Sequence, residues 1–388
     1  MIPIRYNVRS LIVRKTTTIA TALGVGLVVF VLSSALMLSA GIQKTLGVSG
    51  QDDVAIVLRK GSDAELGSVL DTASVNTIVG GPGVKRDETG KPIGVGEIVV
   101  VGALEKIGAS GVANVQIRGV TSEAIKFRPH VHIAFGREAK PGSDEVIVGE
   151  RIRGRFKGTE LGETFDLRKN RPVTVVGVFT DQGSSYESEV WVDLDTLRAA
   201  YGRAGAISSV RVRLDSSSAF DLFKAAMEGE KQYGYLALRE KDYLEKQSQG
   251  TSRFIDVMAT IISFFFAVGA MIGATITMYA AVAHRQREIG TLRALGFSRG
   301  SILFSFLLEA VVLAFFGGAV GAFASLGMGF VHVSMLNFAS WSEIVFGFEP
   351  TPGIILTSLG LAMAMGLFGG FFPAVRASRV SPVAAMRG

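Results

Sequence analysis

The stretch His284-Arg-Gln-Arg-Glu-Ile-Gly-Thr-Leu-Arg-Ala-Leu-Gly296 decides how the rest of the chain is arranged. It is short, basic and amphipathic, and a long apolar run lies on each side of it. In a membrane protein such a segment connects two spanning helices and offers a cytoplasmic partner a surface to bind. The chain is therefore expected to be a membrane protein that another component drives.

The composition supports a membrane protein with a soluble part. Hydrophobic residues make up 48% of the 388 positions, charged residues only 19%, and there are 47 glycines. The net charge of +6 lies in short segments beside apolar runs, so it indicates membrane orientation and argues against nucleic-acid binding. The chain has no Cys, which excludes disulfides and Cys-ligated metals within it.

Four runs are long enough to cross a bilayer, because about 20 apolar residues span its hydrocarbon core. The predicted spanning helices cover 16–43, 254–283, 301–330 and 350–375. A cleaved signal peptide is the alternative for the first run. Its 28 uncharged residues exceed the roughly 7–15 of a signal peptide's apolar core, which favours an uncleaved anchor.

Basic residues beside these runs predict the orientation. Eleven Lys and Arg residues lie before the first run, between the second and third runs, and after the fourth, whereas the loop 331–349 has none. By the positive-inside rule, both termini and 284–300 are cytoplasmic, and 44–253 and 331–349 lie on the opposite side. Residues 1–15 are then a cytoplasmic amphipathic lead-in, and 376–388 a cytoplasmic tail.

The segment 44–253 has dispersed charges and no spanning run, so it is predicted to be a separate α+β domain with an inserted β-rich lobe near 126–205. Apolar and alternating runs predict strands at 53–58, 97–101, 173–179, 190–194 and 210–214. Short helices are expected at 64–70, 144–156, 194–201 and 219–228.

Three pairs of glycines in the apolar runs have the small-xxx-small spacing that lets helix backbones approach closely. They are Gly269 and Gly273, Gly317 and Gly321, and Gly366 and Gly370. Most such pairs join helices of one chain, and only some mark a dimer seam.

Several stretches resemble one family of membrane proteins. They are Arg287-Glu-Ile-Gly-Thr-Leu-Arg-Ala-Leu-Gly296 with Phe306-Leu-Leu-Glu-Ala-Val-Val-Leu313, the ending Gly366-Leu-Phe-Gly-Gly-Phe-Phe-Pro-Ala-Val-Arg-Ala-Ser-Arg-Val-Ser-Pro-Val-Ala-Ala-Met-Arg387, and Val173-Thr-Val-Val-Gly-Val-Phe179 with Glu189-Val-Trp-Val-Asp193. Together they are similar to the FtsX/MacB-type ABC transporter permeases. The resemblance covers the four-helix plan and both ends of the chain.

The resemblance implies that 284–300 is a coupling helix that binds an ATPase. The expected contact residues are Arg287, Glu288, Ile289, Gly290, Leu292, Arg293, Leu295 and Gly296. As a helix, the segment places its three apolar residues Ile289, Leu292 and Leu295 on one stripe that would press into a groove of the partner. Gly290 would allow the closest approach of the partner, and Gly296 suits the C-terminal cap. The alternative is a helical hairpin that is only anchored by its basic residues.

Glu309 is the acidic residue within the third run, and an ionisable group in a membrane helix is a functional candidate. A proton relay or a substrate contact is one interpretation. Its place two to three turns from the cytoplasmic end favours a structural pairing with a basic neighbour instead.

Catalytic chemistry is not predicted for this chain. It has no Gly-x-x-x-x-Gly-Lys-Ser/Thr phosphate loop, so ATP and Mg are expected to bind a partner ATPase. His130 and His132 would share one face of a strand, but no third ligand accompanies them, so no metal site is expected. A protease or a sensor kinase is disfavoured because the cytoplasmic pieces are short and no nucleophile with a base is indicated.

The resemblance implies a permease subunit in the inner membrane that works with two copies of an ABC ATPase and with a second permease subunit, in a homodimer rather than a heterodimer. We expect efflux of a drug, peptide or lipid, with a membrane-fusion protein and an outer-membrane channel. Release of lipoproteins and FtsX-like regulation of cell-wall hydrolases remain alternatives.

Overall fold

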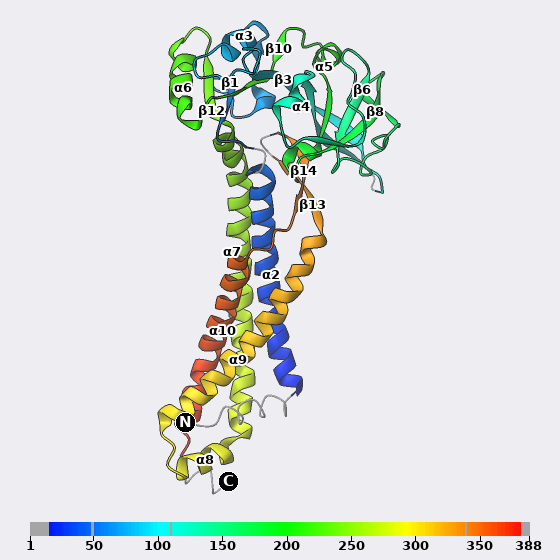
Figure 1. The fold of residues 1–388 in the computed structure, drawn as a ribbon. Helices are drawn as coiled ribbons and strands as arrows, with labels where there is room; N and C mark the ends of the chain where they lie inside the picture. The colour runs from blue at the N-terminus through cyan, green and yellow to red at the C-terminus, as the bar shows by residue number, and fades with distance from the viewer. Residues whose placement is uncertain (1–14, 48–49, 109–110, 338–339, 382–388) are drawn as a thin grey trace. The chain divides into compact units, whose positions relative to one another are not determined.

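The computed structural model describes residues 15–47, 50–108, 111–337 and 340–381, in two compact units (Figure 1). The membrane unit comprises Met1–Gly41, Ser252–Val331 and Gly347–Gly388, and the extramembrane unit comprises Ile42–Thr251 and His332–Phe346. The expected lead-in up to residue 14 and the end of the expected tail from residue 382 lie outside the described residues.

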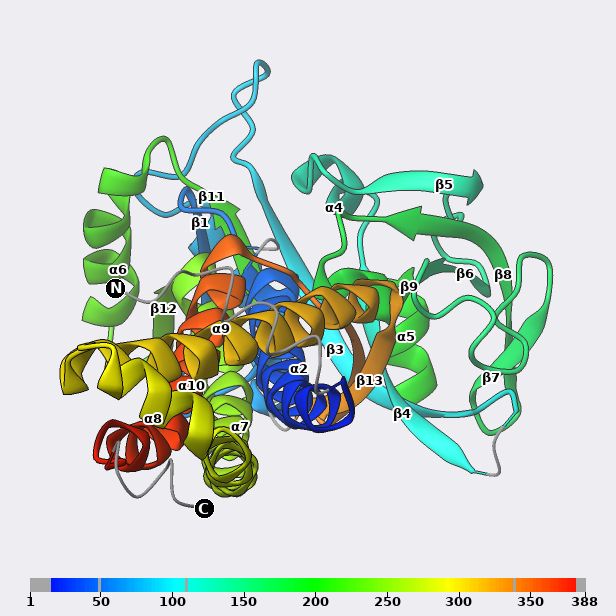
Figure 2. The same cartoon turned by 90° about the horizontal axis from the view of Figure 1, so that it is seen from below.

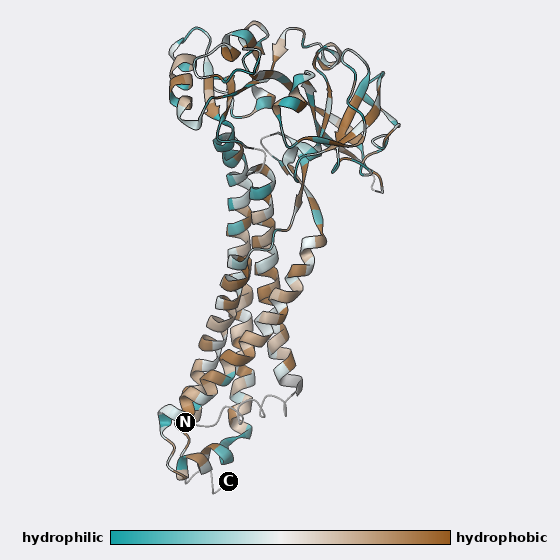
Figure 3. Cartoon of the chain, viewed as in Figure 1, coloured by the Kyte–Doolittle hydropathy of each residue, from teal (hydrophilic) through white to brown (hydrophobic). Residues whose placement is uncertain are grey.

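Four long helices carry the apolar runs. They are α2 (Lys15–Gly47), α7 (Glu240–His284), α9 (Arg299–Leu326), which continues as the 3-10 turn η4 (Gly327–Phe330), and α10 (Pro352–Ser378). Within the described part of the chain, these four helices are long and apolar enough to cross a membrane. Hydrophobic residues colour them brown, whereas the extramembrane unit is mixed (Figure 3). The predicted four-helix membrane protein with an inserted domain is confirmed.

The helix α7 is longer than the run that predicted it. We expected a helix from residue 254, but α7 begins at Glu240, and its first residues, up to Thr251, belong to the extramembrane unit. Residues 240–253 include several charged side chains, so a search for apolar runs excludes them. The chain nevertheless stays helical, because backbone hydrogen bonding does not depend on hydropathy.

Glycines bring α2 and α9 into close contact. A Cβ on Gly321 would lie 2.1 Å from the carbonyl oxygen of Gly26, and a Cβ on Gly317 would lie 2.5 Å from that of Ala22. No larger residue fits at either position without moving a backbone. The predicted pair Gly317 and Gly321 therefore joins two helices of this chain.

The two other glycine pairs differ. A Cβ on Gly366 would lie 2.6 Å from the Cβ of Ala314, and one on Gly370 would lie 2.4 Å from the Cβ of Ala310, so this pair packs α10 against α9. An added Cβ on Gly269 or Gly273 of α7 would meet nothing within 4 Å in the described residues. This third pair therefore makes no close contact with the part of the chain that the structure describes.

The extramembrane unit is built on a ten-stranded sheet, counted over the described residues. Its order is β12-β1-β11-β3-β4-β9-β6-β8-β5, and β7 also pairs with β8. Strands β3 and β4 lie side by side and antiparallel (Figure 2). The strands are β1 (Val54–Arg59), β3 (Gly94–Glu105), β4 (Val112–Val120), β5 (His132–Gly136), β6 (Glu145–Gly149), β7 (Thr164–Arg168), β8 (Arg171–Thr180), β9 (Glu189–Asp193), β11 (Ser209–Arg213) and β12 (Tyr235–Arg239).

Two hydrophobic cores lie along this sheet. One packs β1, β11 and β12 against α3 (Ala73–Val79) and α6 (Phe220–Gly229), and buries Ile78 and Phe223. The other packs β4, β6, β8 and β9 with α5 (Leu194–Tyr201). Shorter elements are α4 (Glu123–Phe127), the 3-10 turns η1 (Glu65–Gly67), η2 (Ser185–Ser188) and η3 (Ser217–Ala219), and the strand pair β2 (Leu70–Asp71) and β10 (Ala206–Ile207).

The five predicted strands and the helices at 194–201 and 219–228 are present. The helix expected over 144–156 is wrong, because its first part forms β6 between β8 and β9. Val146, Ile147 and Val148 are buried there, and consecutive β-branched residues favour a strand that is covered on both faces. The helix expected over 64–70 is reduced to η1 and the start of β2.

The segment 331–349, expected to be a short loop, forms the hairpin of β13 (His332–Asn337) and β14 (Ser342–Gly347). Ile344, Val345 and Phe346 are buried, and His332–Phe346 belongs to the extramembrane unit. Most of the connection between α9 and α10 is therefore part of that unit.

We expect Gly321→Val to lower the stability of the membrane unit by about 1–3 kcal/mol, because the added atoms separate α2 from α9. Gly360→Val on α10 is the matched control, since a Cβ there meets nothing within 4 Å. Thermal melting of the detergent-solubilised protein tests this. Equal melting temperatures for the two variants would contradict the close contact.

Candidate coupling helix and buried ionic network

The segment that opened the sequence analysis forms the helix α8 (Gln286–Ala294), directly after α7. Its end is fixed by Gly296, which has a φ of 94°. The N–H of Phe297 donates to the carbonyl of Leu292 at 3.2 Å, and that of Gly296 donates to Arg293 at 3.2 Å. This is a Schellman motif, which favours glycine at the left-handed position. The expected C-terminal cap at Gly296 is confirmed.

The predicted apolar stripe of α8 is divided between two faces. Ile289 is 1% exposed and packs in a cluster with residues of α7, α9 and α10, including Val282, Phe306 and Ala374, whereas Leu295 is 72% exposed. Residues six apart differ by about 120° around a helix with 3.6 residues per turn, so they do not share a face. Leu292 is half-buried against the same cluster as Ile289.

Gly290 is also buried by this chain's own atoms. The expected close approach of a partner at Gly290 stays a prediction. The exposed side of α8 presents Arg287, Glu288 and Leu295. Arg293 is half-buried, and its guanidinium donates to the carbonyl of Phe297 at 3.2 Å.

Arg285, just before α8, ties the helix to α9. Its Nη1 lies 3.0 Å from Oε2 of Glu309, and its Nε lies 3.1 Å from Oε2 of Glu288. Its guanidinium also lies over the ring of Phe306, 5.1 Å from the centroid. Arg285 and Glu309 are 5% and 6% exposed. Glu309, for which a structural pairing was expected, thus has a basic partner at the start of the coupling segment.

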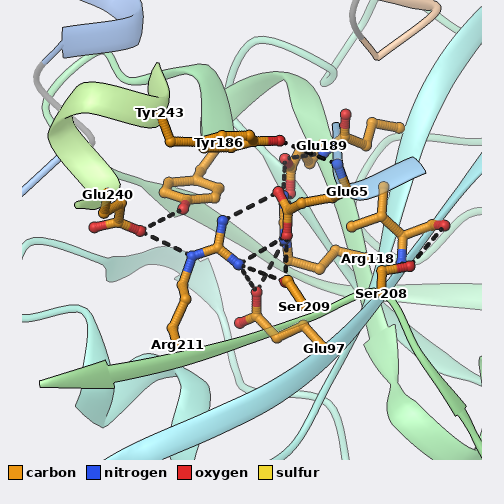
Figure 4. Close-up of polar contacts among 12 residues, drawn as sticks. Glu65, Glu97, Arg118, Tyr186, Glu189, Ser208, Ser209, Arg211, Glu240 and Tyr243 are labelled. Carbon is orange, nitrogen blue, oxygen red and sulfur yellow. Dashed lines mark hydrogen bonds and ion pairs between the residues drawn. The ribbon is translucent and has the colours of Figure 1, made fainter. Parts of the chain in front are cut away.

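A second polar cluster, which we did not predict, lies in the extramembrane unit (Figure 4). Seven charged side chains, all under 10% exposed, meet there; we call them the ionic network. Its members are Glu65, Glu97, Arg118, Arg128, Glu189, Arg211 and Glu240.

Arg118 and Arg211 are the centres of the ionic network. Arg118 lies 2.7 Å from Glu189 and 2.9 Å from both Glu65 and Glu97. Arg211 lies 2.8 Å from Glu65 and 2.9 Å from Glu97. The two guanidiniums therefore share two carboxylates, which satisfies charges that would be costly to bury alone.

Glu97 shows how strongly these charges are coupled. Burial opposes its ionisation, but the charges of Arg128, Arg211 and Arg118 outweigh burial and lower its pKa to about 2. Arg128 lies 2.7 Å from Glu97 and stacks over the rings of Tyr186 and Trp191. The carboxylate therefore remains charged throughout the physiological range.

The first turn of α7 is attached to the ionic network. Glu240, the first residue of the helix, lies 2.8 Å from Nε of Arg211 and accepts from the hydroxyl of Tyr186 at 3.4 Å. The hydroxyl of Tyr243 accepts from the backbone N–H of Glu65 at 3.1 Å. The network thus joins several strands of the sheet to the helix that leads into the membrane unit.

Sequence reasoning missed the ionic network because its members come from distant elements. Arg211 lies in a strand of alternating Val and Arg, a pattern that predicts solvent exposure of the Arg side chains. The only local signal is Glu97, which begins an otherwise apolar run. His130 and His132 are exposed, and the described residues contain no group of three or more His, Asp or Glu that could hold a metal.

Two protein families match the chain. Residues 16–230 match the family described as MacB-like periplasmic core domain, and residues 260–382 match that described as FtsX-like permease C-terminal.

Relatives carry related names. The macrolide export ATP-binding/permease protein MacB of Burkholderia thailandensis is 28% identical over 66% of this chain and 40% of its own length. The uncharacterized ABC transporter permease YknZ of Bacillus subtilis is 27% identical over 63% of this chain and 62% of its own length. The chain spans about two fifths of the length of the MacB relative.

Solved structures of extramembrane regions are also similar. The periplasmic region of MacB from Actinobacillus actinomycetemcomitans covers 52% of this chain and 94% of its own, with 15% identity and a TM-score of 0.39. The extracellular domain of YknZ from Gram-positive bacteria covers 48% and 99%, with 17% identity and a TM-score of 0.36.

Removing one charge from the ionic network should strongly destabilise the extramembrane unit. We expect Arg211→Met to cost about 3–5 kcal/mol, because it leaves buried carboxylates without their partner. Arg171→Met is the control, since the pair of Arg171 with Asp144 is half-exposed and contributes about 0–1 kcal/mol.

Urea unfolding followed by tryptophan fluorescence measures this difference. The chain has two Trp residues, Trp191 and Trp341, and both lie in the extramembrane unit, so the signal reports on that unit. Similar midpoints for the two variants would show that the network contributes no more than a surface pair.

Proposed function

The chain belongs to the FtsX/MacB-type family of ABC transporter permeases, and we propose that it transmits ATP-driven motion of an ATPase to its extramembrane unit. It is a multi-pass membrane protein with four apolar helices among its described residues. In this proposal the motion enters through α8, and the membrane helices carry it onward.

The observation that carries the proposal is the attachment of α8 to its own membrane helices. Arg285 forms an ion pair with Glu309 of α9, and Ile289 is buried among side chains of α7, α9 and α10. A force on α8 therefore moves these helices rather than α8 alone, since packed side chains resist independent displacement. A loosely anchored hairpin, the alternative, would not require these buried contacts.

The exposed face of α8 is the proposed docking surface for the ATPase. It presents the charged Arg287 and Glu288 beside the apolar Leu295, and such a mixed surface suits a specific contact. ATP and Mg bind the ATPase, because the 388 residues contain no phosphate-binding loop. We propose two ATPase copies and a permease homodimer. The pair Gly269 and Gly273, which meets nothing in the described chain, supports a second permease subunit on α7.

We propose efflux as the transport process, with both termini in the cytoplasm and the extramembrane unit on the opposite side of the inner membrane. The distribution of Lys and Arg supports this orientation. The name of the Burkholderia relative, a macrolide export protein, supports export of a drug, peptide or lipid with a membrane-fusion protein and an outer-membrane channel.

Changing the exposed face of α8 should weaken ATPase binding without unfolding the permease. We expect Leu295→Asp to reduce co-purification of the ATPase at least tenfold. The variant loses the free energy of burying one leucine side chain in the interface, about 1.5–3 kcal/mol, and places a charge there instead. Leu222→Asp is the control, since Leu222 on α6 is 61% exposed and lies in the other unit. Equal recovery of ATPase with both variants would exclude this docking surface.

Replacing the buried pair by apolar residues should separate binding from transmission. We expect Arg285→Met with Glu309→Leu to retain folding and ATPase binding, since buried pairs can be exchanged for packed apolar residues at little cost. The amount of substrate exported per ATP hydrolysed should fall several-fold, because the polar tie between α8 and α9 is lost. Export per ATP equal to that of the unchanged protein would show that motion does not pass through this pair.

A further inference from the structure

Residues 340–349, here called the strap, connect the two units in addition to α2 and α7. The strap contains β14 and leads into α10. Its part up to Phe346 belongs to the extramembrane unit, and its part from Gly347 belongs to the membrane unit. Each part is held by contacts within its own unit.

In the extramembrane unit, the strap is held by Glu343, by its backbone and by its buried apolar side chains, Ile344, Val345 and Phe346. The carboxylate of Glu343 lies 2.5 Å from Nζ of Lys106 and 3.6 Å from Nη2 of Arg155. The N–H of Val345 donates to the hydroxyl of Ser188 at 3.1 Å, and its carbonyl accepts from the guanidinium of Arg151. The strap is thereby fixed on Lys106, Arg151, Arg155 and Ser188 of the extramembrane unit.

These contacts place the strap over the ionic network. One pocket is lined by Ser342 and Ile344 of the strap and by Arg118, Glu189 and Tyr186. Ser342 and Ile344 are 1% and 6% exposed, so the strap keeps water from this side of the network. If the strap moved away, water would reach the carboxylates and guanidiniums of the network. Their hydration would then compete with their ion pairs.

In the membrane unit, the strap is held against α2. A Cβ on Gly41 would lie 1.8 Å from the carbonyl oxygen of Gly347, so only glycine allows this approach. The N–H of Glu349 donates to the carbonyl of Met37 at 2.9 Å. Close backbone contact thus attaches the strap to α2.

The attachments of the strap to the two units are separated by very little chain. Val345 and Gly347 are two residues apart, and an extended chain spans at most about 3.6 Å per residue. If Met37 of α2 and Ser188 move apart by more than a few ångströms, one attachment must therefore break. The ion pairs of Glu343 are partly exposed, and such pairs contribute little. Among the contacts of the strap, these ion pairs are therefore expected to break first.

We propose that the strap is a tether that motion of the membrane helices pulls from the extramembrane unit, exposing the ionic network to water, and that Glu343 is the residue that positions it. This inference rests on the proposed function, because the motion comes from the ATPase. It adds a second route of transmission, from α9, α10 and α2 to the inserted lobe.

Cysteine labelling tests the tether directly, because the chain has no Cys of its own. Ser342→Cys places a thiol on the strap at a position that is 1% exposed. The full chain with its ATPase in proteoliposomes is treated with a charged maleimide. We expect slow labelling without nucleotide and at least tenfold faster labelling during ATP hydrolysis. In the isolated chain, adding Glu343→Gln should give a smaller increase without nucleotide, about two- to fivefold, because a partly exposed ion pair contributes little.

Two controls make the result specific. Glu123→Gln removes a carboxylate of the same type from an exposed pair with Lys91, and it should leave labelling of the Ser342→Cys thiol unchanged. Ser68→Cys places a thiol at a buried position of the extramembrane unit that does not line the pocket, and it should stay unlabelled. Faster labelling there as well would mean general opening and would overturn the tether.

The remaining outcomes separate the two hypotheses. If Glu343→Gln does not speed labelling in the isolated chain, Glu343 does not hold the strap and the inference fails. If the ATPase binds and hydrolyses ATP but labelling of the strap is unchanged, the strap does not transmit motion. If the ATPase does not associate with the unchanged chain, the proposed function fails, while the nucleotide-free comparison still decides whether Glu343 holds the strap.

Discussion

The structure depends on one constraint, which is that a charge removed from water needs a partner of opposite sign. Burying a single ion costs several kcal/mol, and only well-placed pairs offset this cost. The protein meets the constraint at two distant places. Arg285 and Glu309 satisfy each other at one end of the membrane helices, and seven charged side chains do so in the extramembrane unit. The pair Arg285 and Glu309 joins two consecutive helices, whereas the ionic network joins elements that are farther apart in the sequence.

Such pairs are weak evidence for stability but strong constraints on geometry. A hydrophobic contact tolerates small slides, whereas a guanidinium that serves two carboxylates accepts only a narrow set of positions. Arg211 contacts Glu65, Glu97 and Glu240, and so it relates a 3-10 turn, a strand and the start of α7 to one another. This arrangement suits a machine whose parts must move as units.

The sequence predicted what depends on local patterns. The length of the apolar runs and the distribution of charge predicted the four membrane helices. Runs of β-branched residues predicted five strands, and Gly296 predicted the end of α8. It failed where a side chain's environment is set by distant residues. Ile289 and Leu295 were placed on one stripe, but the packing of α8 buries one and exposes the other. The ionic network was missed because its members come from separate elements, as Glu65 and Arg211 do. The hairpin β13–β14 was missed because residues outside its own segment hold it, as Lys106 holds Glu343.

The length of α7 has a consequence for how this chain can vary. The helix has 45 residues, which corresponds to about 68 Å at 1.5 Å per residue, more than twice the roughly 30 Å of a membrane's hydrocarbon core. Adding one residue within an unbroken helix turns everything beyond it by about 100°. Glu240 and Tyr243 would then point away from the partners that they now contact. Substitutions along α7 are therefore easier to accommodate than changes in its length. The number of residues in α7 sets the direction of the side chains at its two ends relative to each other.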